Sequence, residues 1–455
     1  MFRRLLIANR GEVAVRVARA ARGLGIETVG VVSEADRGAR WLEHFGESVV
    51  IGGSAPRESY LRAEAIVQAA RQTGCSAVHP GWGFLAENPG FAALCEQFGL
   101  TFVGPSAAVM ERMGLKRPAK EAMEAAGLAG IPGSPGTLTS AEEAARVAAE
   151  VGYPVILKAD AGGGGRGMRA CRDEAALREA FDAASAEALA AFGDGALYLE
   201  RYLEGGRHVE VQVLVDSSGR AVHLFERECS VQRKHQKLVE ESPSPALDAG
   251  QRAALGAAAA RAAASIGYTG AGTIEFLYRP DDGTPRFMEM NARLQVEHPV
   301  SECVTGVDVV EAQLRIAAGQ ALGLDQEAVR LRGHAIECRV NAEDPERDFR
   351  PTPGRLAVFE LADGEGPGAV RVDTHLAAGD EVPPYYDSLL AKVIAHGETR
   401  EEAIETLLRA LAASRVEGVS TTIPLHRAVL DSATFRSGEY DTRSIPGWPP
   451  HRRTA

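Results

Sequence analysis

The sequence predicts a protein of mixed class, α/β in its first part and α+β further along. Short apolar runs alternate with helix-like stretches over residues 1–113, which is typical of a doubly wound α/β domain. Strand-like runs dominate up to about residue 330, and a separate α+β lobe is expected over about 331–446. The length of 455 residues agrees with about three domains of ~150 residues each.

The first part of the chain is expected to carry short strands with helices between them. Apolar runs predict strands at 5–8, 28–32, 48–51, 77–79 and 101–103, and helices are expected at 12–23 and 60–73. The first strand runs into NRGE at 9–12 rather than a Gly-x-Gly-x-x-Gly fingerprint, so we do not expect a dinucleotide site. The turn-rich segment HPGWGF at 79–84 lies between a strand and a helix, where ligands often bind.

The central part is expected to hold a glycine loop and a strand-rich region. The segment PGSPG at 132–136 is typical of a linker or loop. A strand of buried type, PVILK at 154–158, leads into the glycine loop AGGGGRG at 161–167. Further strands are expected at 197–200, 208–215, 221–226, 272–278 and 286–291, and an alanine-rich helix at about 251–266.

Composition narrows the classes of function. A net charge of −12 argues against a nucleic-acid partner, because phosphate backbones are held by clustered lysine and arginine. The sequence has no apolar run of about 18 residues, and MFRRLLIANRGE is too polar for a signal peptide, so we expect a cytoplasmic chain without a membrane partner. The six cysteines form no Cys-x-x-Cys pair, and most are expected to be reduced, buried thiols.

The glycine loop has the composition of a lid over an anionic group. Four successive glycines, among them Gly163, Gly164 and Gly165, remove every Cβ, so backbone N–H groups can close over a phosphate. Lys158 on the preceding strand and Arg166 in the loop add positive charge. No Gly-Lys-Ser/Thr follows, so the loop is not a Walker A motif, and an ordinary flexible loop is the alternative.

Lysine is rare in this sequence, since only six of the 50 basic residues are lysines. In a chain that so prefers arginine, each lysine is a candidate for chemistry that needs a compact ammonium group. Chance placement is the alternative, above all for Lys120 and Lys234. The six are Lys116, Lys120, Lys158, Lys234, Lys237 and Lys392.

Two glutamates are expected to face each other on a β-hairpin. The turn PDDGT at 280–284 separates two predicted strands, and centring it on Asp282 places Glu275 opposite Glu289. Carboxylates paired on one sheet face are destabilising unless a cation lies between them, so we assign the pair to Mg²⁺. Two solvated glutamates are the alternative. The strands look buried because of the apolar neighbours Ile274, Phe276, Phe287, Met288 and Met290.

Polar residues continue along the second strand with a period of two. They are Glu289, Asn291, Arg293, Gln295 and Glu297. A straight strand of this length would extend about 26 Å, longer than one active site, so we expect a bend after Asn291. Arg293 offers a fork for a planar, carboxylate-like anion, and Glu297 is a candidate general base beside it. An ordinary amphipathic strand is the alternative.

Eight segments of the sequence carry a resemblance to a known family. They are LLIANRGE (5–12), HPGWGFLAEN (79–88), AGGGGRGM (161–168), RHVEVQV (207–213), QRKHQKLVEE (232–241), FMEMNARLQVEHPV (287–300), GHAIECRVNAED (333–344) and PPYYDSLLAKV (383–393). They closely resemble biotin carboxylase, an ATP-grasp enzyme, and the resemblance runs from residue 2 to about 445. The resemblance implies an ATP-grasp fold with an N-terminal doubly wound domain, a mobile glycine-loop lid and a C-terminal biotin carboxylase lobe. The implied boundaries are 1–113, 114–203 with the lid at about 131–203, 204–330 with the metal and bicarbonate site, 331–446, and a tail at 447–455.

The resemblance also implies a reaction. ATP and bicarbonate would give carboxyphosphate, and its CO₂ would be captured by the ureido nitrogen of biotin, giving N-carboxybiotin, ADP and phosphate. This is the first half-reaction of an acyl-CoA carboxylase, such as the acetyl-CoA carboxylase of fatty acid biosynthesis, or less often of a two-chain pyruvate carboxylase. The sequence has no Met-Lys-Met biotinylation motif, so a biotin carboxyl carrier protein and carboxyltransferase subunits are expected as separate partners of a homodimer.

Site residues follow from the matching motifs. Residues implied to bind ATP are Lys116, Lys158, Gly163, Gly164, Gly165, Glu200, Arg201, Leu203, His208, Gln232, His235 and Leu277. Residues implied to hold Mg²⁺, or Mn²⁺ in its place, are Glu275, Glu289 and Asn291. Residues implied to bind bicarbonate are Arg293, Gln295 and Val296. Lys237 would neutralise the γ-phosphate and bicarbonate, Glu297 would deprotonate bicarbonate, and Arg339 would stabilise charge on the biotin ureido oxygen.

Three positions depart from the family pattern. Trp82 stands where tyrosine is usual, Leu115 where aspartate is usual, and Ala292 where threonine is common. None of the three departures removes a catalytic group. A different ATP-grasp ligase, or a nucleotide-binding protein without catalysis, remains the alternative, although the latter would be expected to lack one of Lys237, Glu275, Glu289 or Glu297.

Overall fold

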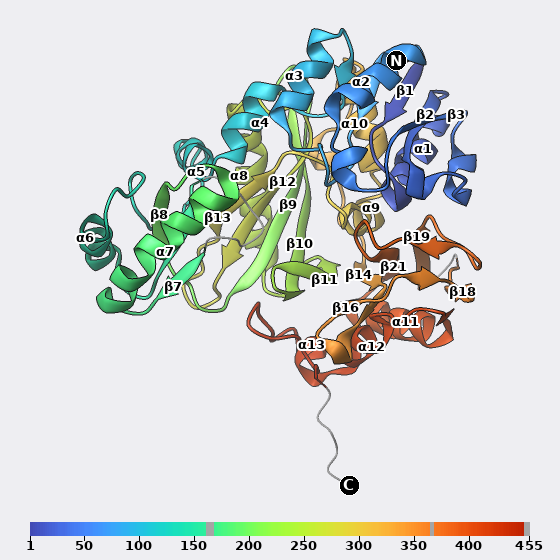
Figure 1. Ribbon diagram of the computed structural model, residues 1–455. Helices are drawn as coiled ribbons and strands as arrows, with labels where there is room; N and C mark the ends of the chain where they lie inside the picture. Colours follow the sequence, from blue (N-terminus) through green and yellow to red (C-terminus); the bar gives the residue numbers. More distant parts are fainter. Residues whose placement is uncertain (161–167, 365–367, 450–455) are drawn as a thin grey trace.

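The computed structural model describes residues 1–160, 168–364 and 368–449, and three units follow one another along the chain (Figure 1). The first holds a five-stranded parallel sheet in the order β3-β2-β1-β4-β5. Its strands are β1 Arg4–Ile7, β2 Glu27–Ser33, β3 Glu47–Gly52, β4 Ala77–His79 and β5 Thr101–Phe102. Its helices are α1 Gly11–Gly23, α2 Ala63–Gln72, α3 Pro89–Gln97 and α4 Ala107–Gly114. The doubly wound prediction is confirmed here.

Local sequence explains where these helices begin. The Asn88 side chain accepts from the Phe91 backbone N–H, and Pro89 occupies the first helical position of α3. The predicted helix 60–73 begins only at Ala63, because the N–H groups of Leu61 and Arg62 bond back to carbonyls in the preceding turn.

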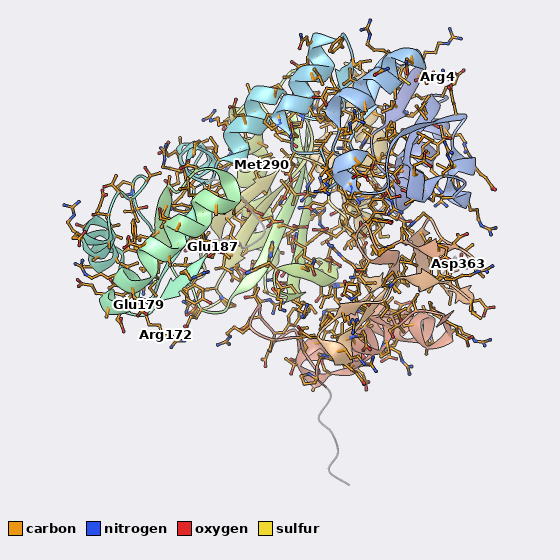
Figure 2. All side chains as sticks on the ribbon, viewed as in Figure 1. Arg4, Arg172, Glu179, Glu187, Met290 and Asp363 are labelled. Atoms are coloured by element: carbon orange, nitrogen blue, oxygen red, sulfur yellow. The ribbon has the colours of Figure 1, made fainter. Side chains whose placement is uncertain are left out.

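A small lid-like unit follows, at left in Figure 1. After α5 Lys116–Ala125, it contains a three-stranded sheet in the order β7-β6-β8, covered by two helices that share an apolar core with it. The elements are α6 Ala141–Val151, β6 Val155–Ala159, β7 Arg169–Cys171, α7 Glu174–Phe192 and β8 Leu197–Arg201. The outer side of α7 carries exposed acids such as Glu179 and Glu187 (Figure 2). The predicted glycines Gly163, Gly164 and Gly165, with Arg166, lie outside the described residues.

An eight-stranded antiparallel sheet forms the centre of the molecule, in the order β13-β12-β9-β10-β11-β14-β21-β19. Its strands are β9 Arg207–Val215, β10 Ala221–Arg233, β11 Gln236–Ser242, β12 Gly270–Tyr278, β13 Arg286–Asn291, β14 His334–Asn341, β19 Ala369–Thr374 and β21 Leu389–Gly397. The C-terminal segment therefore continues the central sheet through the β11–β14 pairing. The sequence had indicated a separate lobe here. The paired residues of β11 and β14 lie about 100 residues apart in the sequence, so no local pattern indicates that they pair.

Helices cover this sheet, and short elements complete the C-terminal segment. The helices are α8 Ala249–Ser265, α9 His298–Thr305, α10 Val309–Ala317, α11 Arg400–Ala413, α12 Ile423–Asp431 and α13 Ala433–Ser437. The short strands are β15 Glu343–Asp344, β16 Arg350–Pro351, β17 Gly354–Arg355, β18 Val358–Glu360, β20 Glu381–Val382 and β22 Arg415–Glu417. The 3₁₀ turns are Glu34–Asp36, Arg40–His44, Pro56–Glu58, Gln326–Ala328 and Pro345–Arg347.

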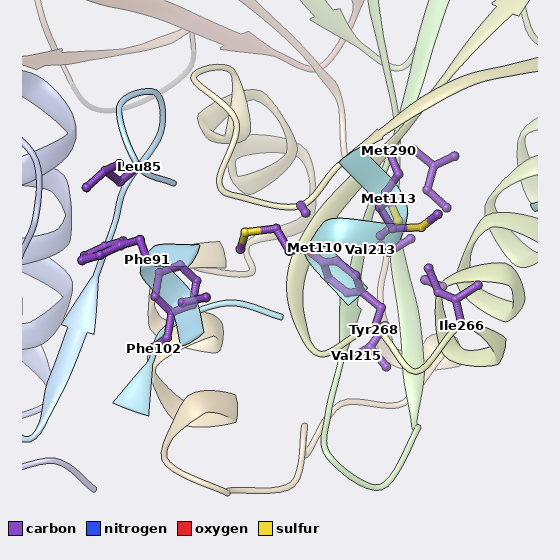
Figure 3. Close-up of a cluster of buried hydrophobic side chains, with 14 of the residues drawn as sticks. Leu85, Phe91, Phe102, Met110, Met113, Val213, Val215, Ile266, Tyr268 and Met290 are labelled. Carbon is purple, nitrogen blue, oxygen red and sulfur yellow. The ribbon is translucent and has the colours of Figure 1, made fainter. Parts of the chain in front are cut away.

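One apolar core joins the first unit to the central sheet. Met110 and Met113 of α4 lie with Val213, Tyr268 and Met290 in the same buried cluster (Figure 3), which extends to Phe91 and Phe102. This shared core fixes the end of β13 relative to the loops of the first sheet.

The six cysteines are all free thiols, and all except Cys303 are buried, as predicted. No helix among the described residues combines the length and apolar character needed to cross a membrane.

Candidate active site

The β12–β13 hairpin pairs Glu275 directly with Glu289, so the predicted register is confirmed. The pairing shifts by one residue next to this point, because Phe276 pairs with Phe287 and leaves Met288 as the extra residue of a bulge. Met288 is consequently 38% exposed. The expectation that Met288 helps to bury the strand was wrong, because the bulge turns it outward.

Glu275 and Glu289 belong to a longer row of glutamates, here called the acid row, which extends one strand further than predicted. Glu275 also pairs with Glu210 of β9, and Glu210 pairs in turn with Arg227 of β10. Three glutamates therefore lie side by side on neighbouring strands, an arrangement that requires compensating cations. His208, Glu210 and Glu275 offer ligand atoms that all lie within 4.8 Å of one another. The carboxylate oxygens of this group suit Mg²⁺ or Mn²⁺, whereas the His208 imidazole is a ligand that softer metals prefer.

The pKa values of the two opposed glutamates are shifted in opposite directions. Burial alone would raise the pKa of Glu275, but the Lys237 ammonium and His208 lower it well below its usual range. Partial desolvation by the surrounding protein, and next the charge of Glu275, raise the pKa of Glu289. A divalent cation placed between the two carboxylates would relieve that repulsion.

Lys237 bridges three carboxylates. Its Nζ lies 2.6 Å from Glu210, 2.9 Å from Glu275 and 2.7 Å from Glu297. Burial lowers the pKa of this ammonium group, but the three carboxylates more than offset that effect and raise the pKa well above its usual value. Lys237 is therefore a fixed positive charge between the acid row and Glu297.

Glu297 is held between two cations. Its Oε1 accepts from Lys237, and its Oε2 accepts from Nη2 of Arg339 at 2.8 Å. Burial would raise the pKa of Glu297, but Lys237 and Arg339 lower it well below its usual range. Arg339 is held in turn by Glu240, whose Oε1 lies 2.6 Å from both Nε and Nη2.

The chain bends after Asn291, as predicted, since β13 ends there and α9 begins at His298. Arg293 donates from Nη2 to Asn291 Oδ1 at 2.9 Å and from Nη1 to Gln295 Oε1 at 2.8 Å. Val296 lies just before Glu297, and its carbonyl oxygen accepts from Nζ of Lys392 at 2.9 Å. The bend brings the amide, guanidinium and carboxylate groups of the predicted anion site into one contact network.

Three lysines gather around Glu200. Lys158 Nζ lies 2.6 Å and Lys120 Nζ 3.4 Å from the Glu200 carboxylate. Burial, and next the charge of Lys158, lower the pKa of Lys116 at the start of α5. The cluster supplies closely spaced ammonium groups of the kind that bind phosphate.

Known proteins match the chain over almost its full length. The family model "Biotin carboxylase, N-terminal domain" matches residues 1–110, "Carbamoyl-phosphate synthase L chain, ATP binding domain" matches 116–325, and "Biotin carboxylase C-terminal domain" matches 337–446. Biotin carboxylase 1 of Bacillus subtilis is 52% identical over 445 residues, which cover 98% of each chain. The chain belongs to the biotin carboxylase family. Biotin carboxylases are ATP-dependent ligases with an ATP-grasp fold, so the predicted fold and enzyme class are confirmed.

Two further relatives show the breadth of this biotin carboxylase family. A pyruvate carboxylase subunit of Methanothermobacter thermautotrophicus is 48% identical, over 98% of this chain and 90% of the relative. The biotin carboxylase domain dimer of Hydrogenobacter thermophilus 2-oxoglutarate carboxylase, in complex with MgADP, ADP and bicarbonate, has a TM-score of 0.93 at 48% identity, over 97% of each chain.

Some predicted site residues of the biotin carboxylase lie apart from the acid row. Arg201 is exposed and donates to the Val151 carbonyl at 3.3 Å. His235 is exposed in the β10–β11 turn, where its φ is 68°. Leu203 and Gln232 are half-buried, and Leu277 lies opposite His208 in the β9–β12 ladder.

Sequence reasoning missed several groups that the structure places in the site. Glu210 could have been found, because HVEVQV at 208–213 alternates polar and apolar residues and places it on the face of His208. Chance placement was kept as the alternative for Lys120, although the rarity of lysine in this sequence was a signal for a functional role. Glu87, which contacts Arg293, gave no local signal because its partner lies about 200 residues away.

Proposed function

We propose that this biotin carboxylase carboxylates carrier-bound biotin through carboxyphosphate, with the residue roles implied by the sequence motifs. The contact network of Lys237, Glu297 and Arg339 beside the paired glutamates supports these roles most directly. It combines a general base, two fixed cations and a site for a divalent metal, as phosphoryl transfer to a weak anionic nucleophile requires.

On the nucleotide side, Lys116 and Lys158 bind the phosphates, with Lys120 as an added positive charge. Glu200 contacts both Lys158 and Lys120, so nucleotide binding draws these ammonium groups from the carboxylate toward phosphate oxygen. Glu275, Glu289 and Asn291 hold Mg²⁺, which supplies charge neutralisation for the γ-phosphoryl group. His208, Leu277 and the predicted segment 200–203 lie on the nucleotide side, with Gln232 and His235 at its margin.

On the bicarbonate side, Arg293, Gln295 and the Val296 backbone bind the anion and Glu297 removes its proton. Lys237 and Arg339 hold Glu297 ionised before substrate binds. When Lys237 turns toward the incoming anions, Glu297 loses part of that stabilisation and its proton affinity rises. The bicarbonate oxygen then attacks the γ-phosphorus and ADP leaves, giving carboxyphosphate. Carboxyphosphate breaks at its C–O bond into CO₂ and phosphate, and the phosphate takes the proton of the biotin ureido nitrogen. Arg339 stabilises the negative charge on the ureido oxygen while the nitrogen attacks CO₂.

We propose further that the chain functions as a cytoplasmic homodimer with a biotin carboxyl carrier protein and carboxyltransferase subunits. The Hydrogenobacter relative is a dimer, and it binds MgADP and bicarbonate. Acetyl-CoA is the proposed final acceptor, with fatty acid biosynthesis as its context. Relatives named for pyruvate and 2-oxoglutarate carboxylation share this domain, which fits a choice of acceptor made by the carboxyltransferase. The proposed domains are 1–113, 114–203, 204–330 and 331–446, with a tail at 447–455.

Phosphate release tests the proposal. Purified protein with ATP, Mg²⁺ and free biotin is expected to release phosphate only when bicarbonate is present, and biotin is expected to increase the rate. Turnover that needs an amine or amino acid in place of bicarbonate would indicate a different ATP-grasp ligase. Nucleotide binding without any turnover would contradict a catalytic role.

A further inference from the structure

Glu87 connects the first unit of the chain to the bend after β13. It belongs to the loop between β4 and α3, one residue before the α3 N-cap. Its Oε1 accepts from the Ala292 backbone N–H at 2.9 Å, and its Oε2 accepts from Arg293 Nε at 2.9 Å. One carboxylate thus fixes both the backbone and the side chain at neighbouring positions of the bend.

This contact determines the orientation of the Arg293 guanidinium. With Nε directed at Glu87, the two Nη groups point to Asn291 and Gln295, on the side of the proposed anion site. A guanidinium is planar, so holding its Nε edge sets the direction of the edge that carries Nη1 and Nη2. Burial would lower the pKa of Arg293, but the charge of Glu87 raises it.

The loop that carries Glu87 is itself well anchored. Nδ2 of Asn9 donates to the carbonyls of Pro80 and Trp82, at 2.7 Å each. Asn88 caps α3, and Phe91 of that helix lies in the core shared with the central sheet. Glu87 therefore presents its carboxylate from a fixed support rather than from a free loop.

We propose that Glu87 is a positioning residue for the bicarbonate site, acting through Arg293. This inference rests on the proposed function, because it takes Arg293 as a bicarbonate contact. Glu87 does not touch the reacting atoms. It holds the guanidinium so that both Nη groups are available to a planar one-carbon anion.

Steady-state kinetics of Glu87→Ala and Glu87→Gln in the full-length enzyme test the inference. Loss of a hydrogen bond to a charged group is expected to raise KM for bicarbonate about tenfold or more in Glu87→Ala. KM for MgATP is expected to change by no more than about twofold, because among the proposed MgATP ligands that the structure describes only Asn291 accepts a hydrogen bond from Arg293. Glu87→Gln keeps the length of the side chain and one of its two acceptor oxygens. It is therefore expected to give an intermediate KM for bicarbonate. Glu96→Gln, an exposed change on α3 of the same unit, is the matched control and should leave both constants unchanged.

The outcomes separate this inference from the function on which it rests. Absence of bicarbonate-dependent turnover in the unaltered enzyme would overturn the proposed function and the inference together. Normal turnover in the unaltered enzyme, with an unchanged bicarbonate KM in Glu87→Ala, would overturn the inference alone. Equal rises in both KM values would also overturn it, since they would indicate a general structural role. If Glu87→Ala does not fold, the same comparison is made with Glu87→Gln, which keeps the size of the side chain and one acceptor oxygen.

Discussion

At the scale of single residues, Lys237 determines the charge state of its neighbours. Three carboxylates share its ammonium group, and two of them, Glu275 and Glu297, have pKa values far below the usual range. A base that is kept ionised by cations is weak until a substrate anion competes for them. The proposed proton transfer from bicarbonate to Glu297 is therefore coupled to anion binding.

Glu297→Gln tests the assignment of the base. The amide keeps the size of the side chain but cannot take a proton, so kcat is expected to fall by about 10² to 10⁴-fold. ATP affinity, measured by titration, should change little, because Glu297 is proposed to act on bicarbonate and not on the nucleotide. A large loss of ATP affinity in this variant would contradict the assignment.

Arg339→Ser tests the role of the guanidinium in the second step. Glu297 keeps its contact with Lys237 in this variant, so bicarbonate-dependent phosphate release should continue. Carboxylation of biotin, followed with labelled bicarbonate, should fall much further, because the ureido oxygen would lose the cation proposed to stabilise its charge. Equal losses in the two assays would argue against a specific role toward biotin.

At the scale of elements, the β11–β14 pairing joins the central strands to the C-terminal ones. Glu241 of β11 accepts from His334 Nε2 at 2.7 Å and from Arg400 Nε at 2.6 Å. Burial would raise its pKa, but these two partners lower it to about 2. The carboxylate thus links two strands of the sheet to α11.

Glu241→Gln is expected to destabilise this junction in a pH-dependent way. A pKa shift from 4.5 to about 2 corresponds to roughly 3 kcal/mol of unfolding free energy near pH 7. Because the pKa is depressed in the folded state, this stabilisation is present above about pH 4.5 and is lost as the pH falls toward 2. Urea titrations at pH 7 and pH 3 should show a smaller difference between variant and unaltered protein at the lower pH. A difference independent of pH would contradict the ionic origin.

Local patterns predicted some elements well and others not at all. The PDDGT turn and the strand alternation were sufficient to place Glu275 opposite Glu289, because hairpin register is determined within a few residues. The bulge at Met288 was not predicted, because an extra residue leaves the alternation intact on both sides. The β11 strand was missed because KLVEES gives a weak alternating signal and its pairing with β14 is long-range.

At the scale of the whole molecule, Lys392 joins distant parts of the chain. Its fully buried ammonium group lies 2.8 Å from Glu12 of α1 and 3.7 Å from Asp373 of β19, and it donates to the Val296 carbonyl. The first unit, the bend after β13 and the C-terminal strands therefore all contact the Lys392 ammonium group. The rarity of lysine pointed to Lys392, but only the fold shows which groups it joins.

Lys392→Met tests this junction. Removing one partner of a buried ion pair is expected to lower the unfolding free energy by about 3 to 5 kcal/mol, because Glu12 is left as an unpaired buried charge. Adding Glu12→Gln should recover part of the loss. Urea denaturation of the single and double variants measures both effects, and a single variant as stable as the unaltered protein would argue against the junction.

In the proposed reaction, bicarbonate attacks the γ-phosphorus at the site formed by Lys237, Glu297 and the paired glutamates. The most direct measurement uses bicarbonate labelled with ¹⁸O, with ATP, Mg²⁺ and biotin, and mass analysis of the phosphate released. The attacking oxygen stays on phosphorus when CO₂ departs, so each phosphate should carry one ¹⁸O atom from bicarbonate. Phosphate without the label would contradict the account.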